Sequence, residues 1–404
     1  TRFLHHMKML YLDSVMKKYN AEPVNKEIYE KMPDGVNLIG DIRAEIGLGQ
    51  SMRLVANELE HSKYPFGIYY FQMGGNIRRE DHTWDAKIKE DYPYKINLFH
   101  INQEAVGTAY LYLDKNIWKN HYNIAFWLWE LEEFPPEHKN AIRFFDEIWT
   151  PSEFASRSIR KITDKPVVTI PYHVTADSDS RFDREFFHLP EDKFLYLVMY
   201  DTNSTMARKN PQGAVEAFKT AFTPADDNVG LVIKMNNPLE KDVEVIKAQL
   251  KGYKNIYFIT EILDKVQVNS LIADVDVFVS LHRAEGFGLV MTEAMLLDTV
   301  CVATNWSSNT EFMNSDVACM VDYKKIPVET EDDIYPDGNT WADADISQAS
   351  DYMKRLYEDK DYYKRLQNNA KQYINEKLGL ESIVKQMEVR LEEIGLSGLK
   401  QDKT

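Results

Sequence analysis

Two glutamates stand eight positions apart in residues 280–295, SLHRAEGFGLVMTEAM. Glu285 falls in a turn after an apolar strand pattern, and Glu293 falls on a helical pattern that begins at about Leu289. A glutamate on a helix usually faces solvent. The turn around Glu285 and the apolar neighbours of Glu293, which include Met291 and Ala294, favour a pair of carboxylates that bind a ligand.

Glycines in the same turn add a second property. Gly286 and Gly288 let the backbone approach a ligand closely. The N–H groups of Phe287 and Leu289 lie near the start of the helix, where they suit a phosphate. The stretch therefore predicts carboxylates beside a phosphate-binding turn.

Two adjacent cations follow another strand pattern, in the sequence YDTNSTMARKNPQGAVEAF (200–218). Arg208 and Lys209 precede a helix, where they could clamp a diphosphate and neutralise a leaving group. Asn203 and Ser204 supply further donors. A surface Arg-Lys pair is often merely solvated, but the position after a strand favours phosphate binding.

Two stretches in the first half of the chain carry less specific signals. The pattern G-x-G in Gly47-Leu48-Gly49 opens a helix, but Met52 replaces the third glycine of a dinucleotide fingerprint. Trp129 and Glu130 end the apolar run NIAFWLW and resemble a sugar site, although core packing explains such aromatics equally well. His100, at the end of KINLFHI, is the other candidate in this half.

Short apolar runs alternate with helical periodicities throughout, which predicts an α/β fold with parallel sheets. Residues 175–193 are polar and lack a sustained period, so they predict a linker between two sheets. Active sites of such sheets lie at the carboxyl ends of strands, in the cleft between the domains. The strands are expected at 36–42, 66–71, 95–101, 123–129, 167–172, 194–200, 229–235, 255–260, 275–280, 300–304 and 318–323.

Helices are expected at 50–60, 103–113 and 152–161, the last with Ser152 as N-cap. A final helix carries one apolar stripe that must pack on another surface. The domain prediction is a Rossmann-like domain over 1–175, a second Rossmann-like domain over 176–378 and a helix over 379–404. The stripe consists of Leu380, Ile383, Val384, Met387, Leu391 and Ile394.

The composition excludes several classes of function and location. The 404 residues include 64 acidic and 48 basic ones, a net charge of −16, which argues against nucleic-acid binding. Cys301 and Cys319 lie in apolar runs, as free thiols of a reducing compartment do. No run of about 20 apolar residues predicts a transmembrane segment. A cytoplasmic protein is expected, with contact at the inner face of the membrane left open.

The block 280–313 resembles the retaining glycosyltransferases of family 4, which have the GT-B fold and serve bacterial polysaccharide and glycoconjugate synthesis. Glu285 and Glu293 match the family's E-x7-E pattern, and VCVATNWSSNTEFM (300–313) resembles the strand and loop that follow it. The resemblance implies that Glu285 lies beside the donor sugar and that Glu293 holds the ribose. It also places Gly47 and Gly49 close to the donor diphosphate. It further implies that 1–175 is the acceptor-side domain, that 176–378 is the nucleotide-sugar domain and that the helix 379–404 crosses back to the first domain.

The sequence departs from the family at two points. Asn203 stands near the usual position of an arginine, so Lys209 is the firmer phosphate ligand and Lys234, where relatives carry glycines, could supply the missing charge. Glu130 stands near a usual histidine, which leaves the acceptor-side residue open among Glu130, Trp129 and His100.

The implied function is the retaining transfer of a hexosyl or N-acetylhexosaminyl group from a nucleotide-diphosphate sugar to an acceptor hydroxyl. The acceptor would be a glycan, a lipid-linked or a protein-linked group, and a protein partner or homo-oligomer stays open. No metal or cofactor is expected, because cations replace Mg²⁺ and no D-x-D stands at a suitable strand end.

Other interpretations share parts of these patterns. An inverting GT-B enzyme, a nucleotide-sugar 2-epimerase and a non-catalytic GT-B subunit that partners an active transferase would have the same architecture. A Rossmann oxidoreductase would need the missing third glycine and a ribose-binding acid.

Overall fold

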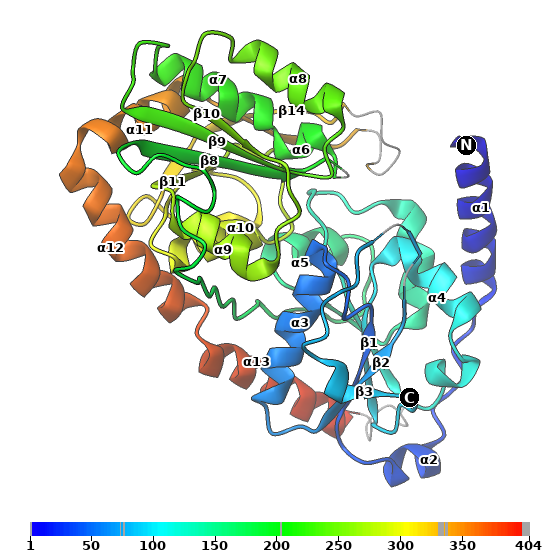
Figure 1. Ribbon diagram of the computed structural model, residues 1–404. Coiled ribbons are helices and arrows are strands. Elements are labelled where there is room, and N and C mark those ends of the chain that lie inside the picture. The colour runs from blue at the N-terminus through cyan, green and yellow to red at the C-terminus, as the bar shows by residue number, and fades with distance from the viewer. Residues whose placement is uncertain are drawn as a thin grey trace. The chain divides into compact units, whose positions relative to one another are not determined.

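The computed structural model describes residues 2–72, 74–75, 77–202, 204–329, 335 and 338–397. They form two compact units (Figure 1): unit 1 holds the described residues up to His173 and from Leu378 onward, and unit 2 runs from Val174 to Lys377. The chain therefore passes between the units at two places. Each unit is built on a parallel sheet, which confirms the predicted fold class.

The sheet of unit 1 has seven strands in the order β3-β2-β1-β4-β5-β6-β7, and every neighbouring pair is parallel. All residues of β1 and β4 are buried, as expected for central strands of a covered parallel sheet. The strands are β1 Val36–Gly40, β2 Phe66–Tyr70, β3 Ile88–Lys89, β4 Ile96–His100, β5 Tyr122–Phe126, β6 Glu147–Thr150 and β7 Val167–Thr169.

A row of buried asparagines fixes the register of three strands in this sheet. Asn37 on β1 lies opposite Asn97 on β4, which lies opposite Asn123 on β5. Asn37 Nδ2 donates to Asn97 Oδ1 at 2.8 Å, and Asn97 Nδ2 donates to Asn123 Oδ1 at 2.9 Å. A slip by one residue would leave these amides buried without partners, at a cost of about 1–3 kcal/mol each.

The helices of unit 1 include two that the sequence predicted closely. α5 has Ser152 as its N-cap, and the Ser152 hydroxyl accepts from Ala155 N at 3.2 Å. α3 begins three residues earlier than expected, while the expected helix 103–113 is a 3-10 turn, η2 Gln103–Ala105, followed by α4. The helices are α1 Arg2–Lys18, α2 Lys26–Lys31, α3 Gly47–Glu60, α4 Val106–Tyr112, α5 Glu153–Arg160 and α13 Leu380–Ser397, with 3-10 turns η1 Asp85–Lys87, η3 Lys115–Trp118 and η4 Pro136–Phe144.

The last helix, α13, belongs to unit 1 although unit 2 precedes it in the sequence. It packs against α3, as Figure 1 shows. The predicted stripe is buried from Ile383 to Ile394, and Leu380 is half-buried. Arg390 pairs with Glu147 on β6, with Nε donating to Oε1 at 2.8 Å.

The sheet of unit 2 has six parallel strands in the order β10-β9-β8-β11-β12-β13. The strand expected at 318–323 is β13, and a separate antiparallel hairpin of β14 and β15, which the sequence did not predict, follows it. The strands are β8 Phe194–Asp201, β9 Val229–Asn236, β10 Ile256–Ile259, β11 Val277–Ser280, β12 Val300–Thr304, β13 Cys319–Val321, β14 Tyr323–Pro327 and β15 Thr340–Ala344.

Helices of unit 2 bury an apolar core against this sheet. Phe218 on α7 and Met353 on α11 pack in one cluster with Tyr196 of β8, whose hydroxyl donates to Met353 O at 2.6 Å. The helices are α6 Met206–Lys209, α7 Pro211–Ala221, α8 Glu240–Gln249, α9 Lys265–Ala273, α10 Leu289–Leu296, α11 Ile346–Glu358 and α12 Lys360–Lys377, with the 3-10 turn η5 Ser308–Glu311.

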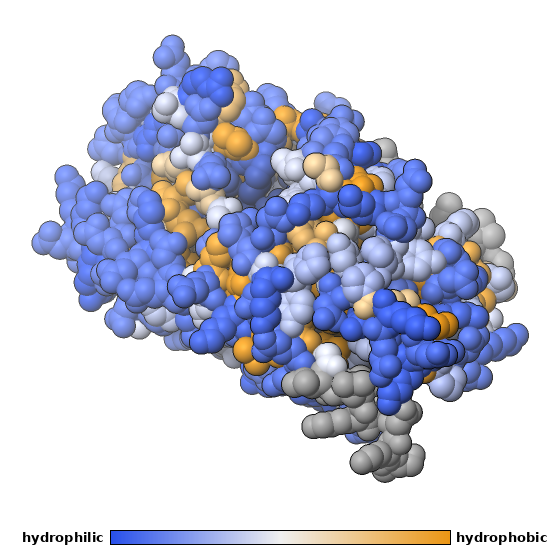
Figure 2. All heavy atoms as spheres, turned by 90° about the horizontal axis from the view of Figure 1, so that it is seen from below, coloured by the Kyte–Doolittle hydropathy of each residue, from blue (hydrophilic) through white to orange (hydrophobic). Residues whose placement is uncertain are grey.

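The surface in Figure 2 is mainly hydrophilic, and hydrophobic side chains gather there in separate patches. This agrees with the 28% of charged residues in the sequence. Among the described helices, none is both long enough and apolar enough to cross a membrane.

A buried carboxyl group in unit 1 predicts a pH-dependent stability. Glu58 on α3 is fully buried, and its Oε1 accepts from His173 N at 2.8 Å. Burial raises the pKa of Glu58 well above its ordinary value of 4.5, although the bond from His173 lowers it. The folded state therefore holds a proton that the unfolded state releases above about pH 4.5, so stability is lost as the pH rises toward the raised pKa.

We expect unit 1 to lose up to about 1.4 kcal/mol of stability per pH unit as the pH rises from about 4.5 toward the raised pKa of Glu58, relative to a Glu58→Gln variant. His100 has the opposite effect below about pH 6.5, because burial lowers its pKa to about 3, but both proteins contain it and its contribution cancels in the comparison. Urea unfolding of both proteins at several pH values measures the difference. Parallel curves for the two proteins would contradict the assignment to Glu58.

Candidate functional site

The site of unit 2 lies where the strand order of its sheet reverses. β8 and β11 are neighbours, and successive strands from each proceed toward opposite edges of the sheet. In open α/β sheets, ligands bind outside the carboxyl ends of the strands at such a point. The loops after β8 and β11 are the two segments in which the sequence predicted cations and Glu285.

The loop after β8 is tied to the loop after β11 through backbone groups. Arg283 N donates to Arg208 O at 2.7 Å, and Arg208 Nη1 donates to Ala284 O at 3.0 Å. Asn210 adopts a left-handed conformation with φ 50°, caps α7 and donates from Nδ2 to Leu281 O at 2.9 Å. These bonds hold α6 against the turn that contains Glu285.

Glu285 forms ion pairs with both predicted cations. Its side chain is 11% exposed, with Arg208 Nη1 at 3.4 Å from Oε1 and the Lys209 ammonium in direct contact with the same oxygen. Burial alone would raise the pKa of Glu285. The charges of Lys209 and Arg208 outweigh it and lower this pKa to about 2, so the carboxylate is ionised at neutral pH.

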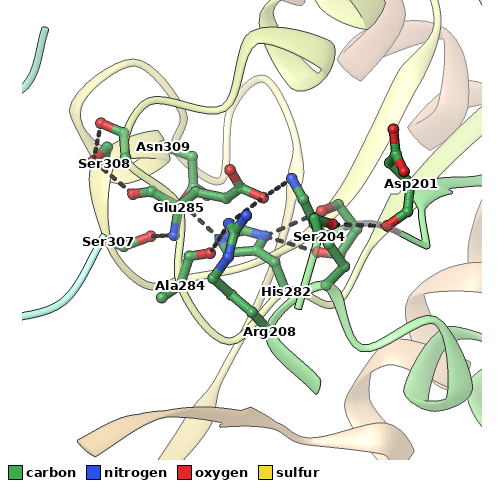
Figure 3. A network of polar contacts seen from close by, with 12 residues as sticks. Asp201, Ser204, Arg208, His282, Ala284, Glu285, Ser307, Ser308 and Asn309 are labelled. Atoms are coloured by element: carbon green, nitrogen blue, oxygen red, sulfur yellow. Dashed lines mark hydrogen bonds and ion pairs between the residues drawn. The ribbon is translucent and has the colours of Figure 1, made fainter. Parts of the chain in front are cut away.

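A third loop, after β12, holds the backbone of Glu285 (Figure 3). Ser307 Oγ accepts from Glu285 N at 3.0 Å, and Ser308 Oγ lies 2.8 Å from the carbonyl oxygens of Glu285 and Gly286. Ser307 has φ 71°, a conformation uncommon for a residue with a side chain. The loop therefore fixes the turn from the side opposite Arg208.

His282 connects the same two loops from inside unit 2. The ring is fully buried, with Nε2 at 3.1 Å from Asn309 Oδ1 and 3.2 Å from Trp306 O. Burial lowers the pKa of His282, while Glu285 raises it. On the other side of the ring, Nδ1 lies 3.1 Å from Ser280 Oγ and 3.2 Å from Ser280 O.

The glycine turn leads into α10 as the sequence predicted. Gly288 has φ 101° and precedes Leu289, the first residue of the helix. The positive φ of Gly288 disfavours a side chain there, and a Cβ would also require Met291 Cε, 2.6 Å away, to move. Phe287 is buried against Phe312, with ring centroids 5.2 Å apart, which anchors the turn.

Glu293 lies deeper on α10 and pairs with a residue of α9. Its side chain is 1% exposed, and Lys265 Nζ lies 2.5 Å from Oε1. Oε2 has no hydrogen-bond partner among the residues that the structure describes. The arrangement leaves one carboxylate oxygen able to accept from a ligand.

Lys234 is fully buried near the end of β9. Its ammonium donates to Asn236 Oδ1 at 2.6 Å and to Met235 O at 3.2 Å. Burial lowers the pKa of Lys234 to about 8, although Glu261 and Asp201 raise it. A buried cation without a close carboxylate in the described part of the chain is suited to an anion.

In unit 1, the predicted glycines Gly47 and Gly49 lie at the start of α3, and they differ in burial and in the space around them. A Cβ on Gly49 would lie 2.0 Å from Ala44 O, so this position needs glycine for packing within its own unit. Gly47 is exposed with open space around it, and Leu48 is half-buried between them.

The three acceptor-side candidates are mostly turned inward. His100 is buried, stacks on Phe126 and bonds through Nε2 to Ser51 Oγ at 2.7 Å. Trp129 is buried and donates from Nε1 to Glu133 O at 3.0 Å. Glu130 is half-buried beside it, so it presents more of its side chain to solvent than the other two.

The structure thus brings Arg208 and Lys209 to Glu285, and places Gly286 to Leu289 directly after it. Ser204 lies near β8, where its hydroxyl donates to Asp201 O at 2.8 Å. Asn203 lies outside the described residues.

Three contributors to the site were not singled out from the sequence. His282, Ser307 and Ser308 hold the turn through contacts between loops that are more than 20 residues apart. Their signal in the sequence is their position directly after β11 and β12, at the same end of the sheet as Glu285.

Two doubly wound parallel sheets, one with this site at its switch point, define the class of GT-B proteins. Solved structures share the fold. Sucrose-phosphate synthase from Thermosynechococcus elongatus has a TM-score of 0.65 at 13% identity, over 90% of this chain and 100% of that one. HepE of Anabaena in complex with UDP-glucose has a TM-score of 0.64 at 12% identity, over 89% and 100%.

TarM of S. aureus, solved with fondaparinux, α-GlcNAc-glycerol and UDP, has a TM-score of 0.53 at 14% identity. That match covers 73% of this chain, which spans 55% of the length of TarM. No curated protein sequence matches the chain.

Residues 179–373 match the family model described as glycosyl transferases group 1. The match spans nearly all of unit 2. Unit 2 is therefore similar in sequence to the glycosyl transferases of group 1.

Proposed function

We propose that the protein is a retaining glycosyltransferase that moves a hexosyl or N-acetylhexosaminyl group from a nucleotide-diphosphate sugar to an acceptor hydroxyl. The observation that carries this proposal is the ionised Glu285 paired with Arg208 and Lys209 at the switch point of unit 2. A carboxylate beside two cations suits a reaction in which a sugar gains positive charge while a diphosphate leaves.

In this proposal, different residues of unit 2 bind the diphosphate, the sugar and the ribose of the donor. Lys209 and Arg208 bind the diphosphate, with Lys234 as a further cation and the N–H groups of the turn before α10 as donors. Glu285 orients the sugar and faces the charge that develops at its anomeric carbon. Glu293 accepts hydrogen bonds from the ribose.

For retention, the acceptor hydroxyl attacks the face from which the diphosphate leaves. The new glycosidic bond forms as the old one breaks, and the leaving phosphate oxygen takes the proton of the acceptor hydroxyl. The acceptor is a glycan, a lipid-linked or a protein-linked group. Gly47, which has open space around it, allows close approach of the donor, whereas Gly49 serves packing in its own unit. Glu130 is the most exposed of the acceptor-side candidates.

The proposal is tested first by donor binding. UDP-glucose is the first probe, because HepE was solved with it; UDP-GlcNAc, GDP- and dTDP-sugars follow. We expect one nucleotide sugar to raise the melting temperature. At a concentration about one hundred times its Kd, the ligand should add about 2.7 kcal/mol to the free energy of unfolding. Slow hydrolysis of that donor by the isolated protein, with retained anomeric configuration, would support transfer. Binding without turnover would favour a non-catalytic subunit.

We expect the activity to survive treatment with EDTA. The reason is that Arg208, Lys209 and Lys234 supply the positive charge that Mg²⁺ supplies in other transferases. Initial rates before and after chelation, with added Mg²⁺ and Mn²⁺ in parallel, measure the effect. Complete loss that either ion restores would overturn the role of these cations.

A further inference from the structure

The ion pair between Lys265 and Glu293 joins two helices of unit 2 at a buried oxygen. Glu293 is 1% exposed, whereas the side chain of Lys265 is 39% exposed. Lys265 therefore reaches from the surface to a carboxylate inside, with Nζ at 2.5 Å from Oε1. Among the described residues, no other cation forms an ion pair with Glu293.

The capped start of α9 fixes the backbone position of Lys265. Asp264 caps the helix by accepting from Gln267 N at 2.8 Å, and Asp264 N donates to Gln267 Oε1 at 3.0 Å. This reciprocal pair sets the first turn of the helix, in which Lys265 is the first residue. The backbone that carries the ammonium is thus held while the long side chain bridges to α10.

The chemistry of a half-paired carboxylate gives the bridge its role. Burying a carboxylate without a counter-charge is strongly unfavourable. The Lys265 ammonium supplies this counter-charge, and its contact with Oε1 also restricts the rotation of the carboxylate. With Oε1 held, Oε2 remains buried and lacks a hydrogen-bond partner among the described residues. An oxygen held in this way suits a hydroxyl donor of a ligand.

We propose that Lys265 is a positioning residue for donor binding, which holds Glu293 so that Oε2 accepts from a hydroxyl of the bound nucleoside diphosphate. The inference rests on the proposed function for the identity of the ligand. Lys265 acts through Glu293 and touches neither the diphosphate nor the reacting atoms.

The test measures UDP binding by calorimetry for the wild type, Lys265→Met, Lys265→Arg, Glu293→Gln and the double variant. We expect Lys265→Met to weaken UDP binding about tenfold, and Lys265→Arg to restore most of that loss because it keeps the charge. The double variant should bind as weakly as Glu293→Gln alone, within about twofold, because the lysine acts through the carboxylate.

A matched control is Lys219→Met, which breaks the exposed pair with Glu216 on α7, 2.9 Å apart, and should leave UDP binding unchanged. In turnover assays, Lys265→Met should raise the KM for the donor and change kcat by less than about twofold. If Lys265 had a merely structural role, Lys265→Met would lower the melting temperature but would not raise the KM for the donor. The double variant would then also bind UDP more weakly than Glu293→Gln alone.

The possible results distinguish failure of the Lys265 proposal from failure of the proposed glycosyltransferase function. UDP binding by Lys265→Met equal to that of the wild type, or a loss that adds fully to that of Glu293→Gln, would overturn the role of Lys265 and leave the proposed function standing. Failure of every nucleotide and nucleotide sugar to bind the wild type would overturn both. If Lys265→Met does not fold, Lys265→Gln carries the same expectations.

Discussion

Replacing Glu285 with Gln is expected to lower the rate of sugar transfer by about a hundredfold to a thousandfold. The amide keeps the shape of the side chain but removes the negative charge that faces the reacting sugar. Because the pKa of Glu285 is about 2, the wild-type carboxylate is fully ionised above pH 4, and the loss should be the same at every pH from 5 to 9. Initial rates with saturating donor measure it.

The matched control for this variant is Glu216→Gln, which alters an exposed carboxylate of the same unit. It should keep wild-type rates. Binding of the donor to Glu285→Gln should stay within a few-fold of the wild type, because Arg208 and Lys209 retain their charges. An unchanged kcat would remove Glu285 from the chemical step, and a loss confined to donor affinity would make it a binding residue.

Replacing Met387 with Ala is expected to destabilise unit 1 by about 2–5 kcal/mol. Met387 is fully buried on α13, so the substitution removes apolar contacts and leaves a cavity where this helix packs on unit 1. Urea unfolding measures the loss, and hydrogen exchange assigns it to unit 1 through the amides of α3 and β6.

Val389→Ala serves as the control, because Val389 lies on the same helix and is 46% exposed. Its effect should stay within about 0.5 kcal/mol. Equal effects of the two substitutions would show that α13 is stabilised by helix propensity and not by its buried stripe.

The sequence predicted those elements whose signal is local. Apolar runs marked the central strands β1, β4, β8, β9 and β12, and Ser152 marked the start of α5. The sequence missed β6, because its first residue is Glu147. This buried glutamate is paired with Arg390, 243 residues later, and also accepts from Tyr122 and Trp149. Composition within a window cannot show such a partner.

The same distinction applies to the site. Arg208 and Lys209 were expected at the end of one strand and Glu285 at the end of another, and the strand order brings them into contact. The pairing itself could not be foreseen, because either cation could equally have faced solvent. The anchoring by Ser307 and the bridge from Lys265 to Glu293 arise from loops and helices that are distant in the sequence.

The place of α13 has a consequence for how the protein is made. Unit 1 needs this helix, but the ribosome produces it only after all of unit 2. At about 5–20 residues per second, the intervening two hundred or so residues take roughly 10–40 s to synthesise. Throughout that interval the surface for the apolar stripe is uncovered and Glu147 lacks Arg390. The nascent chain therefore completes unit 2 first, and the half that begins the sequence is the last to finish folding.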